Sequence, residues 1–515
     1  MLVDKPVIQP PDQLVKETPM PAHSQSTAPY LRLTFPLHAL LASVAAAALM
    51  ASSPGRAQSP NDELTTWRAT SRLGYGPTLA TAQAAQNDPK SWALQQIDAA
   101  YAASRQAPDI PTALARFNQP INDIARDFHT EREARRVARA AAAPTTPVTP
   151  GMASMAMAEA ALPAEAGFSR EMQQTASAWR VMACSDPTLE NPLLARMTEF
   201  WFNHLNVFTG KGVVRPFVGH YVVNVIRAHA LGKFEDLLLA SARHPAMLLY
   251  LDQAQSNVRG INENYAREMM ELHTLGVNAG YSQNDVRELA RILTGWTVNL
   301  PQGEGFVFAP RLHDNGDKTL LGRTFKSGGV QEGEDAIRML ARHPATAQRI
   351  ARRLATTFVA DQPSQALMGK LATTFTATQG DIRAVMTALV NSPDFWRADN
   401  TLFKTPLDFA CSALVANGGA KERREIALTL GFLAQAGQPM HGWQTPDGYK
   451  TDAATWLAPE ALTRRADFAI TLGGRMQEPT YLQPFLSAAS RERIAREAPG
   501  VRSGLTLASP DFMNK

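Results

Sequence analysis

A short turn sequence recurs along the chain and constrains the fold more than any other feature. The residues Ala-Arg-His-Pro-Ala at 242–246 occur again at 341–345, each time after an apolar stretch with helical periodicity. Looser Ser-Pro versions stand at 391–395 and 508–512. Proline at the first helical position costs no hydrogen bond, and a Ser or His before it can cap the exposed amides. We therefore predict an all-α fold of helical hairpins packed in one large body, with His244 and His343 as turn residues.

Strand signals are sparse in the same part of the chain. Only Gly305–Phe308 and Thr319–Phe325 have the composition of strands. They are enough for one small β-hairpin at most.

The N-terminus contains an export signal. An Ala/Leu-rich run from Leu37 to Met50 follows Arg32, and the small residues Gly55 and Ala57 fit a signal-peptidase site. The run is shorter than the roughly 20 residues that span a bilayer. No twin arginine precedes it, so the general secretory route is favoured. We predict a signal peptide region at 1–57, a periplasmic protein and no stable membrane span.

Composition divides the remainder into three parts. Residues 58–137 read as an N-terminal helical segment, and 168–515 as the main helical body. Between them, residues 138–167 are nearly all Ala, Pro, Thr, Met and other small types, which is typical of a linker or loop.

Charge and cysteine content exclude some classes of protein. The net charge is only +4, and no basic stripe is interleaved with aromatic residues, which argues against nucleic-acid binding. Cys184 and Cys411 lack the spacing of a zinc site. They are either one disulfide in an oxidising compartment or two buried small residues, and the sequence leaves both open. It specifies no cofactor or metal.

The stretch from Asn262 to Val298 concentrates charged residues on helical patterns. Glu263, Arg267 and Glu271 are spaced at i, i+4 and i+8, the pattern of a salt-bridge ladder. Ser282 to Asp285 matches a capping box, so a second helix begins there. Its Arg287 and Arg291 lie on one flank and can reach the carboxylates of the first helix. The interpretation is one structural charge network: Glu263, Arg267, Glu271, Arg287 and Arg291.

Other polar residues lie where ordinary helix packing would place apolar ones. Glu268 falls inside the apolar arc of its helix, where a carboxylate must be paired, protonated or bound to a cation. His204 lies in the middle of an apolar stripe and is either a satisfied core histidine or a site residue. His313 and Asp314 begin a polar loop that an Asx turn explains without an ion. These four residues are the candidates for catalysis.

The same segment resembles the central signature of a bacterial family, domain of unknown function 1800. Further motifs match in order: Leu73-Gly74-Tyr75-Gly76-Pro77, Phe200 to His204, His313-Asp314 with Lys318 to Gly322, Lys404-Thr405-Pro406, Gly437-Gln438-Pro439, Trp456, and Leu462 to Arg465. The resemblance covers about residues 65–470. It implies bacterial export and pairing with a second exported, sulfatase-like protein, and it implies no established activity or catalytic residues.

Two hypotheses about function follow. The first is an exported accessory or maturation partner of the sulfatase-like protein, since the sequence has no nucleophile elbow, HExxH, P-loop or dinucleotide fingerprint. The second is a metal-assisted or acid/base hydrolase that uses Glu268, His204, His313 and Asp314. It requires those side chains to converge on one cavity.

Overall fold

Helices form most of the fold, which confirms the all-α prediction. The structure is a computed structural model that describes residues 63–142 and 167–515. The N-terminal helices are α2 (Glu63–Arg72), α3 (Leu79–Ala85), α4 (Pro89–Ser104) and α5 (Ile121–Ala142). The central helices are α7 (Phe168–Ser185), α8 (Pro192–His204), α9 (Val218–Tyr221), α10 (Phe234–Arg243), α11 (Pro245–Tyr250), α12 (Asn264–Glu268) and α13 (Gln283–Ile292).

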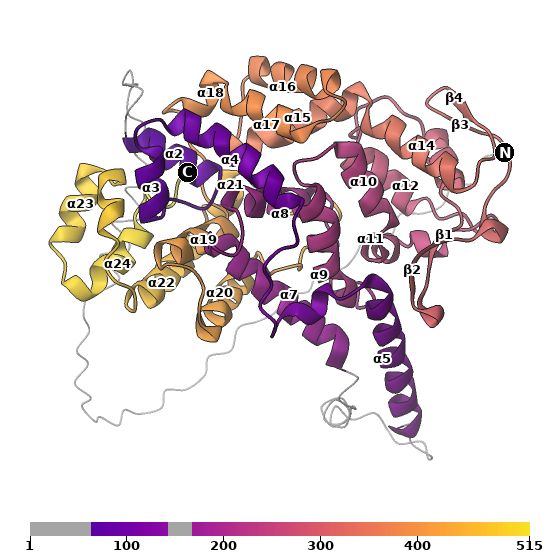
Figure 1. Cartoon of the computed structure of the whole chain (residues 1–515), viewed down its shortest axis with the longest axis horizontal. Helices are drawn as coiled ribbons and strands as arrows, with labels where there is room; N and C mark the ends of the chain where they lie inside the picture. The colour runs from indigo at the N-terminus through magenta and orange to yellow at the C-terminus, as the bar shows by residue number, and fades with distance from the viewer. Residues whose placement is uncertain (1–62, 143–166) are drawn as a thin grey trace, which may run out of the picture.

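The second half of the chain is also helical. Its elements are α14 (Val330–Ala341), α15 (Pro344–Phe358), α16 (Gln365–Ala377), α17 (Ile382–Val390), α18 (Pro393–Trp396), α19 (Pro406–Ala416), α20 (Arg423–Gln435), α21 (Ala453–Trp456), α22 (Pro459–Gly473), α23 (Ala488–Ala495) and α24 (Pro499–Ala508). Figure 1 shows α19–α24 at one end, α10–α14 at the other, and α7 and α8 between them.

The repeated turns have the predicted structure. His244 and His343 are N-caps, and their Nδ1 atoms accept from the amides of Ala246 and Ala345 at 3.1 and 3.2 Å. The following proline is the first residue of α11 and of α15. The capping box of Ser282 and Asp285 at the start of α13 is also confirmed.

The prediction of one β-hairpin at most is wrong, because the described residues form two. Strand β1 (Trp296–Asn299) pairs antiparallel with β2 (Glu304–Phe308), and β3 (Lys318–Leu320) pairs antiparallel with β4 (Arg323–Phe325). The two predicted strand segments therefore belong to different hairpins. Leu321 and Gly322 both have positive φ (51° and 78°), which suits the tight two-residue turn between β3 and β4.

The N-terminal segment is not a separate body. Helix α4 packs on α8 and α17, and α5 packs on α7 and β2. Apolar residues of α4 and α5 share a core with the central helices. The boundary predicted at residue 138 also differs, because α5 continues through Arg139 to Ala142, and alanine has the highest helix propensity. Residues 143–166 of the predicted linker lie outside the described residues.

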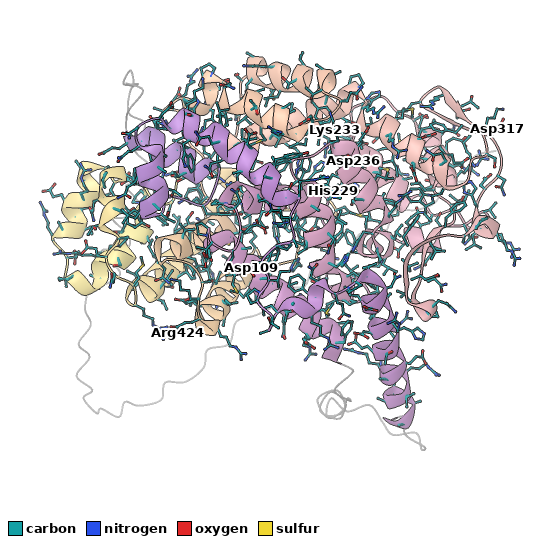
Figure 2. All side chains as sticks on the ribbon, viewed as in Figure 1. Asp109, His229, Lys233, Asp236, Asp317 and Arg424 are labelled. Atoms are coloured by element: carbon teal, nitrogen blue, oxygen red, sulfur yellow. A yellow bond between two sulfur atoms is a disulfide. The ribbon has the colours of Figure 1, made fainter. Side chains whose placement is uncertain are left out.

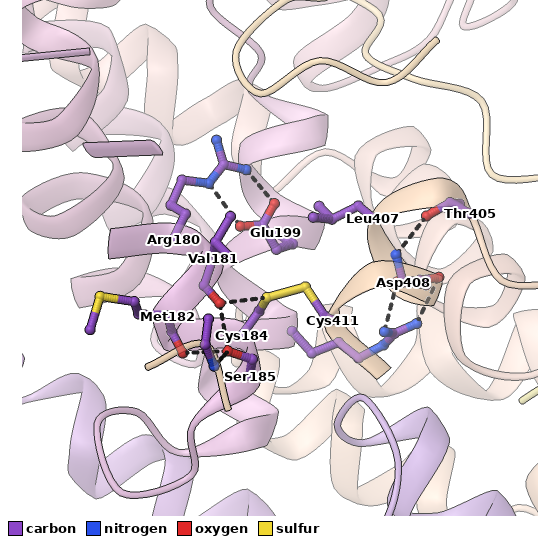
Figure 3. Close-up of a disulfide and its surroundings, with 12 residues drawn as sticks. Arg180, Val181, Met182, Cys184, Ser185, Glu199, Thr405, Leu407, Asp408 and Cys411 are labelled. Carbon is purple, nitrogen blue, oxygen red and sulfur yellow. Dashed lines mark hydrogen bonds and ion pairs between the residues drawn. A yellow bond between two sulfur atoms is a disulfide. The ribbon is translucent and has the colours of Figure 1, made fainter. Parts of the chain in front are cut away.

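A second core joins the C-terminal helices to the middle of the chain. It contains residues of α19, α20, α22 and α24 together with Val181 and Cys184 of α7. The open question about the cysteines is resolved, since Cys184 and Cys411 form a disulfide between α7 and α19 (Figure 3). This covalent bond links α7 to α19 beside the cavity described below.

Within residues 63–142 and 167–515, no helix has the length and apolar character needed to cross a membrane. The prediction that no stable span occurs agrees with this finding for the described part of the chain.

Candidate functional site

A cavity of about 360 Å³ lies where α7, α8, α15 and α19 meet the loop at 437–452. The loop is held to α8 by Asn203, whose Nδ2 donates to the Tyr449 carbonyl at 2.9 Å and whose Oδ1 accepts from the Tyr449 amide at 2.7 Å. Gly448 has a positive φ of 75°, and a Cβ there would lie 2.0 Å from the Asn203 carbonyl oxygen. Only glycine permits this close approach.

One wall carries a buried ion pair that extends to a histidine. Arg180 of α7 donates from Nε to Glu199 Oε1 of α8 at 2.8 Å, and Nη2 contacts Oε2 (Figure 3). Its Nη1 donates to His441 Nδ1 at 2.8 Å. A guanidinium only donates, so Nδ1 is unprotonated and the neutral ring carries its proton on Nε2. Burial, and then the charge of Arg180, holds the pKa of His441 well below its ordinary value.

His441 also has an unusual backbone. Its φ is 56°, a left-handed conformation that is uncommon for residues other than glycine. The conformation is held because its carbonyl accepts from Thr209 N at 3.2 Å and from Thr209 Oγ1 at 3.0 Å. Such strained residues concentrate at binding and active sites. His441 is therefore a neutral, fixed hydrogen-bonding group of the cavity wall rather than a proton acceptor at neutral pH.

A second ion pair lies on another wall. Arg196 of α8 binds both carboxylate oxygens of Asp408 of α19, at 2.8 and 3.3 Å, and Lys515 Nζ also contacts Asp408. Burial alone would raise the pKa of Asp408, but the charges of Arg196 and Lys515 hold it below its ordinary value. Burial, followed by the charge of Arg196, lowers the pKa of Lys515 to about 8, although Asp408 opposes that shift.

Two more buried cations stand behind this pair. Lys404 Nζ donates to the Phe512 carbonyl at 2.7 Å, and Arg465 Nη2 donates to the Lys404 carbonyl at 2.7 Å. Neither makes an ion pair within the described residues, but Lys404 lies 4.1 Å from the centre of the Phe512 ring and Arg465 4.5 Å from that of Phe403. Arg465 Nε and Nη1 have no hydrogen-bond partner among these residues. Burial lowers the pKa of Lys404 well below its ordinary value and that of Arg465 to about 10. We call these residues the cavity cluster: Arg196, Lys404, Asp408, Arg465 and Lys515.

Two further cavity residues hold donors without acceptors. The buried hydroxyl of Tyr75 has no partner, although Arg196 lies over its ring at 5.0 Å. Burial, and then the charge of Glu199, raises the pKa of Tyr75 well above its ordinary value. Arg353 of α15 lines the cavity and makes no hydrogen bond or ion pair with its side chain to any described residue. Burial, followed by the charge of Arg349, lowers its pKa to about 10.

The predicted site residues are not gathered in this cavity. His204 is buried in the core and does not line the cavity; its Nε2 donates to the His273 carbonyl at 3.0 Å, and its Nδ1 has no partner among the described residues. Burial, then the charges of Arg353 and Arg349, holds the pKa of His204 well below its ordinary value. Glu268 ends α12, just before a π-helical turn at Met269–His273.

Glu268 is half-buried and has no hydrogen bond or ion pair within the part of the chain that the structure describes. Burial, and then the negative charge of Glu271, raises its pKa. No described hydrogen bond or ion pair joins Glu268 to His204, His313 or Asp314. The convergence that the hydrolase hypothesis requires is absent from these contacts.

His313 and Asp314 belong to a different buried group, which we call the loop cluster: Arg291, His313, Asp314, Lys318 and Glu332. His313 Nδ1 donates to the Thr294 carbonyl at 2.8 Å, and Nε2 lies 2.9 Å from Glu332 Oε1. Lys318 Nζ donates to the same Oε1 at 2.7 Å. Arg291 binds both oxygens of Asp314, at 2.8 and 3.2 Å. No sequence pattern pointed to Glu332, the carboxylate at the centre of this cluster.

The predicted charge network between α12 and α13 is two separate groups in the structure. Arg267 lies 3.3 Å from Glu263 and 3.6 Å from Glu271, as the ladder predicts. Arg291 instead reaches Glu288 and Asp314, since the loop after β2 brings Asp314 closer than the acids of α12. Arg287 has no ion pair within the described residues. Asp317 lies at the far edge of this region (Figure 2) and forms a solvent-exposed ion pair with Lys326.

All residues of the two clusters except Lys515 lie within one family match. A family model described as a protein of unknown function, DUF1800, matches residues 68–514. The chain belongs to the DUF1800 family. No curated protein and no solved structure matches it. The motifs that first suggested DUF1800 supply much of the site, since Tyr75, Asn203, Lys404, Gln438 and Arg465 all belong to them.

Proposed function

We propose that this DUF1800 protein is an exported binding protein that holds a small acidic ligand in the cavity. The ligand would carry a carboxylate, sulfate or phosphate group, because the groups left without partners are donors. The observation that carries the proposal is the charge balance of the cavity cluster. Arg196 and Lys515 share the carboxylate of Asp408, whereas Lys404 and Arg465 contact only backbone carbonyls and aromatic rings among the described residues.

Buried charges are normally paired, because leaving one without a counter-charge costs several kcal/mol. Glu199 cannot supply the missing charge, since Arg180 already binds both of its carboxylate oxygens. The Tyr75 hydroxyl and Arg196 Nε are further buried donors without acceptors among the described residues. The half-buried Arg353 makes no hydrogen bond or ion pair with them, although the charge of Asp447 acts on it. An anion in the adjacent cavity would neutralise the cations and accept these hydrogen bonds.

Export is supported by the disulfide as well as by the N-terminal sequence. Disulfides persist in oxidising compartments and are rare in the cytosol. Cys184 and Cys411 are nearly fully buried, as expected of a structural bond. Signal peptide, secretory route and periplasmic location remain predictions, because residues 1–57 lie outside the described residues.

Thermal unfolding with added ligand tests the binding proposal. Sodium salts of small carboxylic acids, sulfate and phosphate are compared with chloride at equal ionic strength. A ligand at 100 times its Kd stabilises the folded state by about 2.7 kcal/mol, and the effect saturates. Sulfate and phosphate also stabilise proteins without binding, but that effect does not saturate.

Two neighbouring arginines provide the matched variants for this test. Arg353→Gln removes an unpaired cation of the cavity, and Arg352→Gln removes an exposed cation one residue away. Saturable stabilisation that Arg353→Gln reduces and Arg352→Gln leaves intact supports the proposal. If no acidic compound produces saturable stabilisation, the proposal is wrong.

The accessory role with a sulfatase-like protein rests on the family resemblance and is compatible with a binding function. Co-purification from the native host tests it, and recovery of the protein alone at native levels would count against it. The acid/base hydrolase stays the alternative, with Glu268 as its main support, because this carboxyl has a raised pKa and no partner. Turnover that Glu268→Gln abolishes would favour that alternative.

A further inference from the structure

One part of the cavity wall is a single layer of chain, residues 439–447, which we call the wall loop. The loop contains no helix or strand. Its residues Met440 and His441 line the cavity, whereas Gln444 and Thr445 are exposed to solvent. The same few residues therefore contact the cavity on one side and the solvent on the other.

The wall loop has the closed ends and internal packing of an Ω-loop. The Tyr449 hydroxyl donates to the Pro439 carbonyl at 2.9 Å and so joins the two ends. Within the loop, Trp443 Nε1 donates to Asp447 at 2.9 Å, and the Trp443 ring lies 4.8 Å from that of Tyr449. Loops of this kind are compact units and are frequently functional. The wall loop can therefore move as one body.

Glycines with positive φ flank the wall loop on both sides. Gly437 has a φ of 81° and Gly448 a φ of 75°. Glycine adopts this conformation and most others without a steric penalty, so it can absorb a change in backbone angles. The two glycines are suited to be the hinges of the loop.

The wall loop is attached to the rest of the protein mainly by hydrogen bonds to its backbone. Asn206 Nδ2, just after α8, donates to the carbonyls of Trp443 and Thr445 at 3.1 and 2.8 Å. The Tyr250 hydroxyl of α11 donates to the Gln444 carbonyl at 2.7 Å. Water can replace each of these bonds when the loop opens, so the net cost of breaking them is small.

Little apolar burial opposes this opening. Among residues 439–447, all of which the structure describes, only Met440 packs on a hydrophobic core. His441 adds its contact with Arg180, but its left-handed backbone is strained in the closed loop and is held there by Thr209. Segments with few buried apolar contacts open locally without unfolding of the whole protein.

We propose that the wall loop is a gate, which opens about Gly437 and Gly448 to admit the ligand and closes over the occupied cavity. This inference rests on the proposed function and adds how the ligand reaches its site. Tyr250 and Thr209 hold the loop closed but do not line the cavity. They are positioning residues, which act through the loop and not on the ligand.

Cleavage by chymotrypsin measures the opening, because Trp443 is the only aromatic residue of the wall loop. A protease needs the chain around this residue to leave the body, so the cleavage rate follows the population of the open form. We expect cleavage after Trp443, identified by mass spectrometry of the fragments, at urea concentrations below those that unfold the protein. Cleavage only together with global unfolding would overturn the inference. This arm needs neither a variant nor a ligand.

Two tyrosines provide the matched variants. Tyr250→Phe removes one bond to the loop and should speed cleavage after Trp443 about two- to tenfold, the change that loss of one hydrogen bond gives. Tyr481→Phe is the control, since the Tyr481 hydroxyl also donates to a backbone carbonyl, that of Pro77 at 3.3 Å, and does not contact the loop. Equal acceleration in both variants would indicate a general loss of stability and would overturn the inference.

Sodium succinate, sulfate and phosphate, each compared with chloride at equal ionic strength, link the gate to the site. A salt that binds saturably should slow cleavage after Trp443, by up to about 100-fold at 100 times its Kd, because the open loop removes part of the site. Saturable binding that leaves the cleavage rate unchanged would overturn the gate and leave the proposed function standing. If none of the three salts binds, the proposed function fails for these acids and the gate fails with it, whatever the cleavage rate.

Discussion

The cavity cluster and the loop cluster are both buried groups of charge, and they differ in how their charges are balanced. In the loop cluster the Lys318 amine binds Glu332, and Arg291 binds Asp314 through two contacts. In the cavity cluster, Lys404 and Arg465 contact backbone carbonyls and aromatic rings but no carboxylate among the described residues, and Asp408 already binds two other cations. The loop cluster also contributes nothing to the cavity wall. Complete pairing is what a structural anchor needs, whereas surplus donors beside a cavity indicate a ligand.

The largest contrast should come from neutralising the central carboxylate of each cluster. Asp408→Asn and Glu332→Gln each leave buried cations unpaired, so each should reduce the free energy of unfolding by about 3–5 kcal/mol. A saturating acidic ligand of the cavity should restore much of the loss in Asp408→Asn and none in Glu332→Gln, because only Asp408 lines the cavity. Urea unfolding at constant ionic strength measures both. Equal rescue of the two variants would contradict the distinction.

Removing the disulfide should affect the cavity more than the loop. The bond closes 227 residues of sequence and joins α7, which carries Arg180, to α19, which carries Asp408. The double variant Cys184→Ser, Cys411→Ser should lose about 3 kcal/mol of stability and bind the acidic ligand more weakly. Calorimetry and urea unfolding give the two values. If the double variant were less stable but bound the ligand with unchanged affinity, the disulfide would not be what positions the cavity residues.

The two clusters should respond to opposite ends of the pH range. The lowered pKa of Lys515, about 8, means that this amine loses its charge above that pH in the free protein. An anion favours the charged amine, so affinity should fall as pH rises through about 8, with proton uptake on binding. Lys404, whose pKa is also lowered, acts in the same direction. Titrations from pH 7 to 9.5 in buffers of different ionisation enthalpy test this, with Lys515→Gln as the control.

The loop cluster should respond to acid instead. Burial alone would raise the pKa of Glu332, but hydrogen bonds from His313 and Lys318 hold it below its ordinary value of 4.5. A carboxyl with a lowered pKa in the folded state contributes stability above its unfolded pKa and loses it as pH falls through the folded value. Stability should therefore decrease in acid below about pH 4.5, less steeply in Glu332→Gln. An equally steep decrease in the unaltered protein and in Glu332→Gln would show that groups other than Glu332 cause the acid sensitivity.

The smallest effects concern single hydroxyls. Tyr75→Phe removes a buried hydroxyl without a partner, so stability should change by less than about 1 kcal/mol while ligand affinity falls about five- to tenfold. Thr294 is the counterpart in the loop region, since its Oγ1 accepts from the Asp314 amide at 2.8 Å. Thr294→Val should lose about 1–2 kcal/mol of stability and no affinity. If Tyr75→Phe reduced stability but not affinity, and Thr294→Val reduced affinity, the ligand would be assigned to the loop region instead of the cavity.

The sequence predicted what depends on near neighbours. The helices, the His-Pro caps at His244 and His343 and the capping box at Ser282 are local, and all three are present. The ladder of Glu263, Arg267 and Glu271 is local too. Each follows from residues within about two helical turns of one another.

The site could not be predicted in the same way, because its contacts join distant parts of the chain. Arg180 and His441 are 261 residues apart, and Arg196 and Asp408 are 212 apart. Arg291 likewise binds Asp314, 23 residues away, and not the carboxylates of α12 as predicted. The useful signal was present in the family motifs that contain Tyr75, Lys404, Gln438 and Arg465, but only the fold shows that these motifs meet around one cavity.

Calorimetric titration of the unaltered protein with small carboxylates, sulfate and phosphate, at pH 7 and constant ionic strength, tests the central claim most directly. The account predicts saturable binding of one ligand per chain, weakened in Arg353→Gln and unchanged in Arg352→Gln. Heats that do not saturate with any of these compounds, or equal affinity in both variants, would contradict the claim that the cavity binds an acidic ligand.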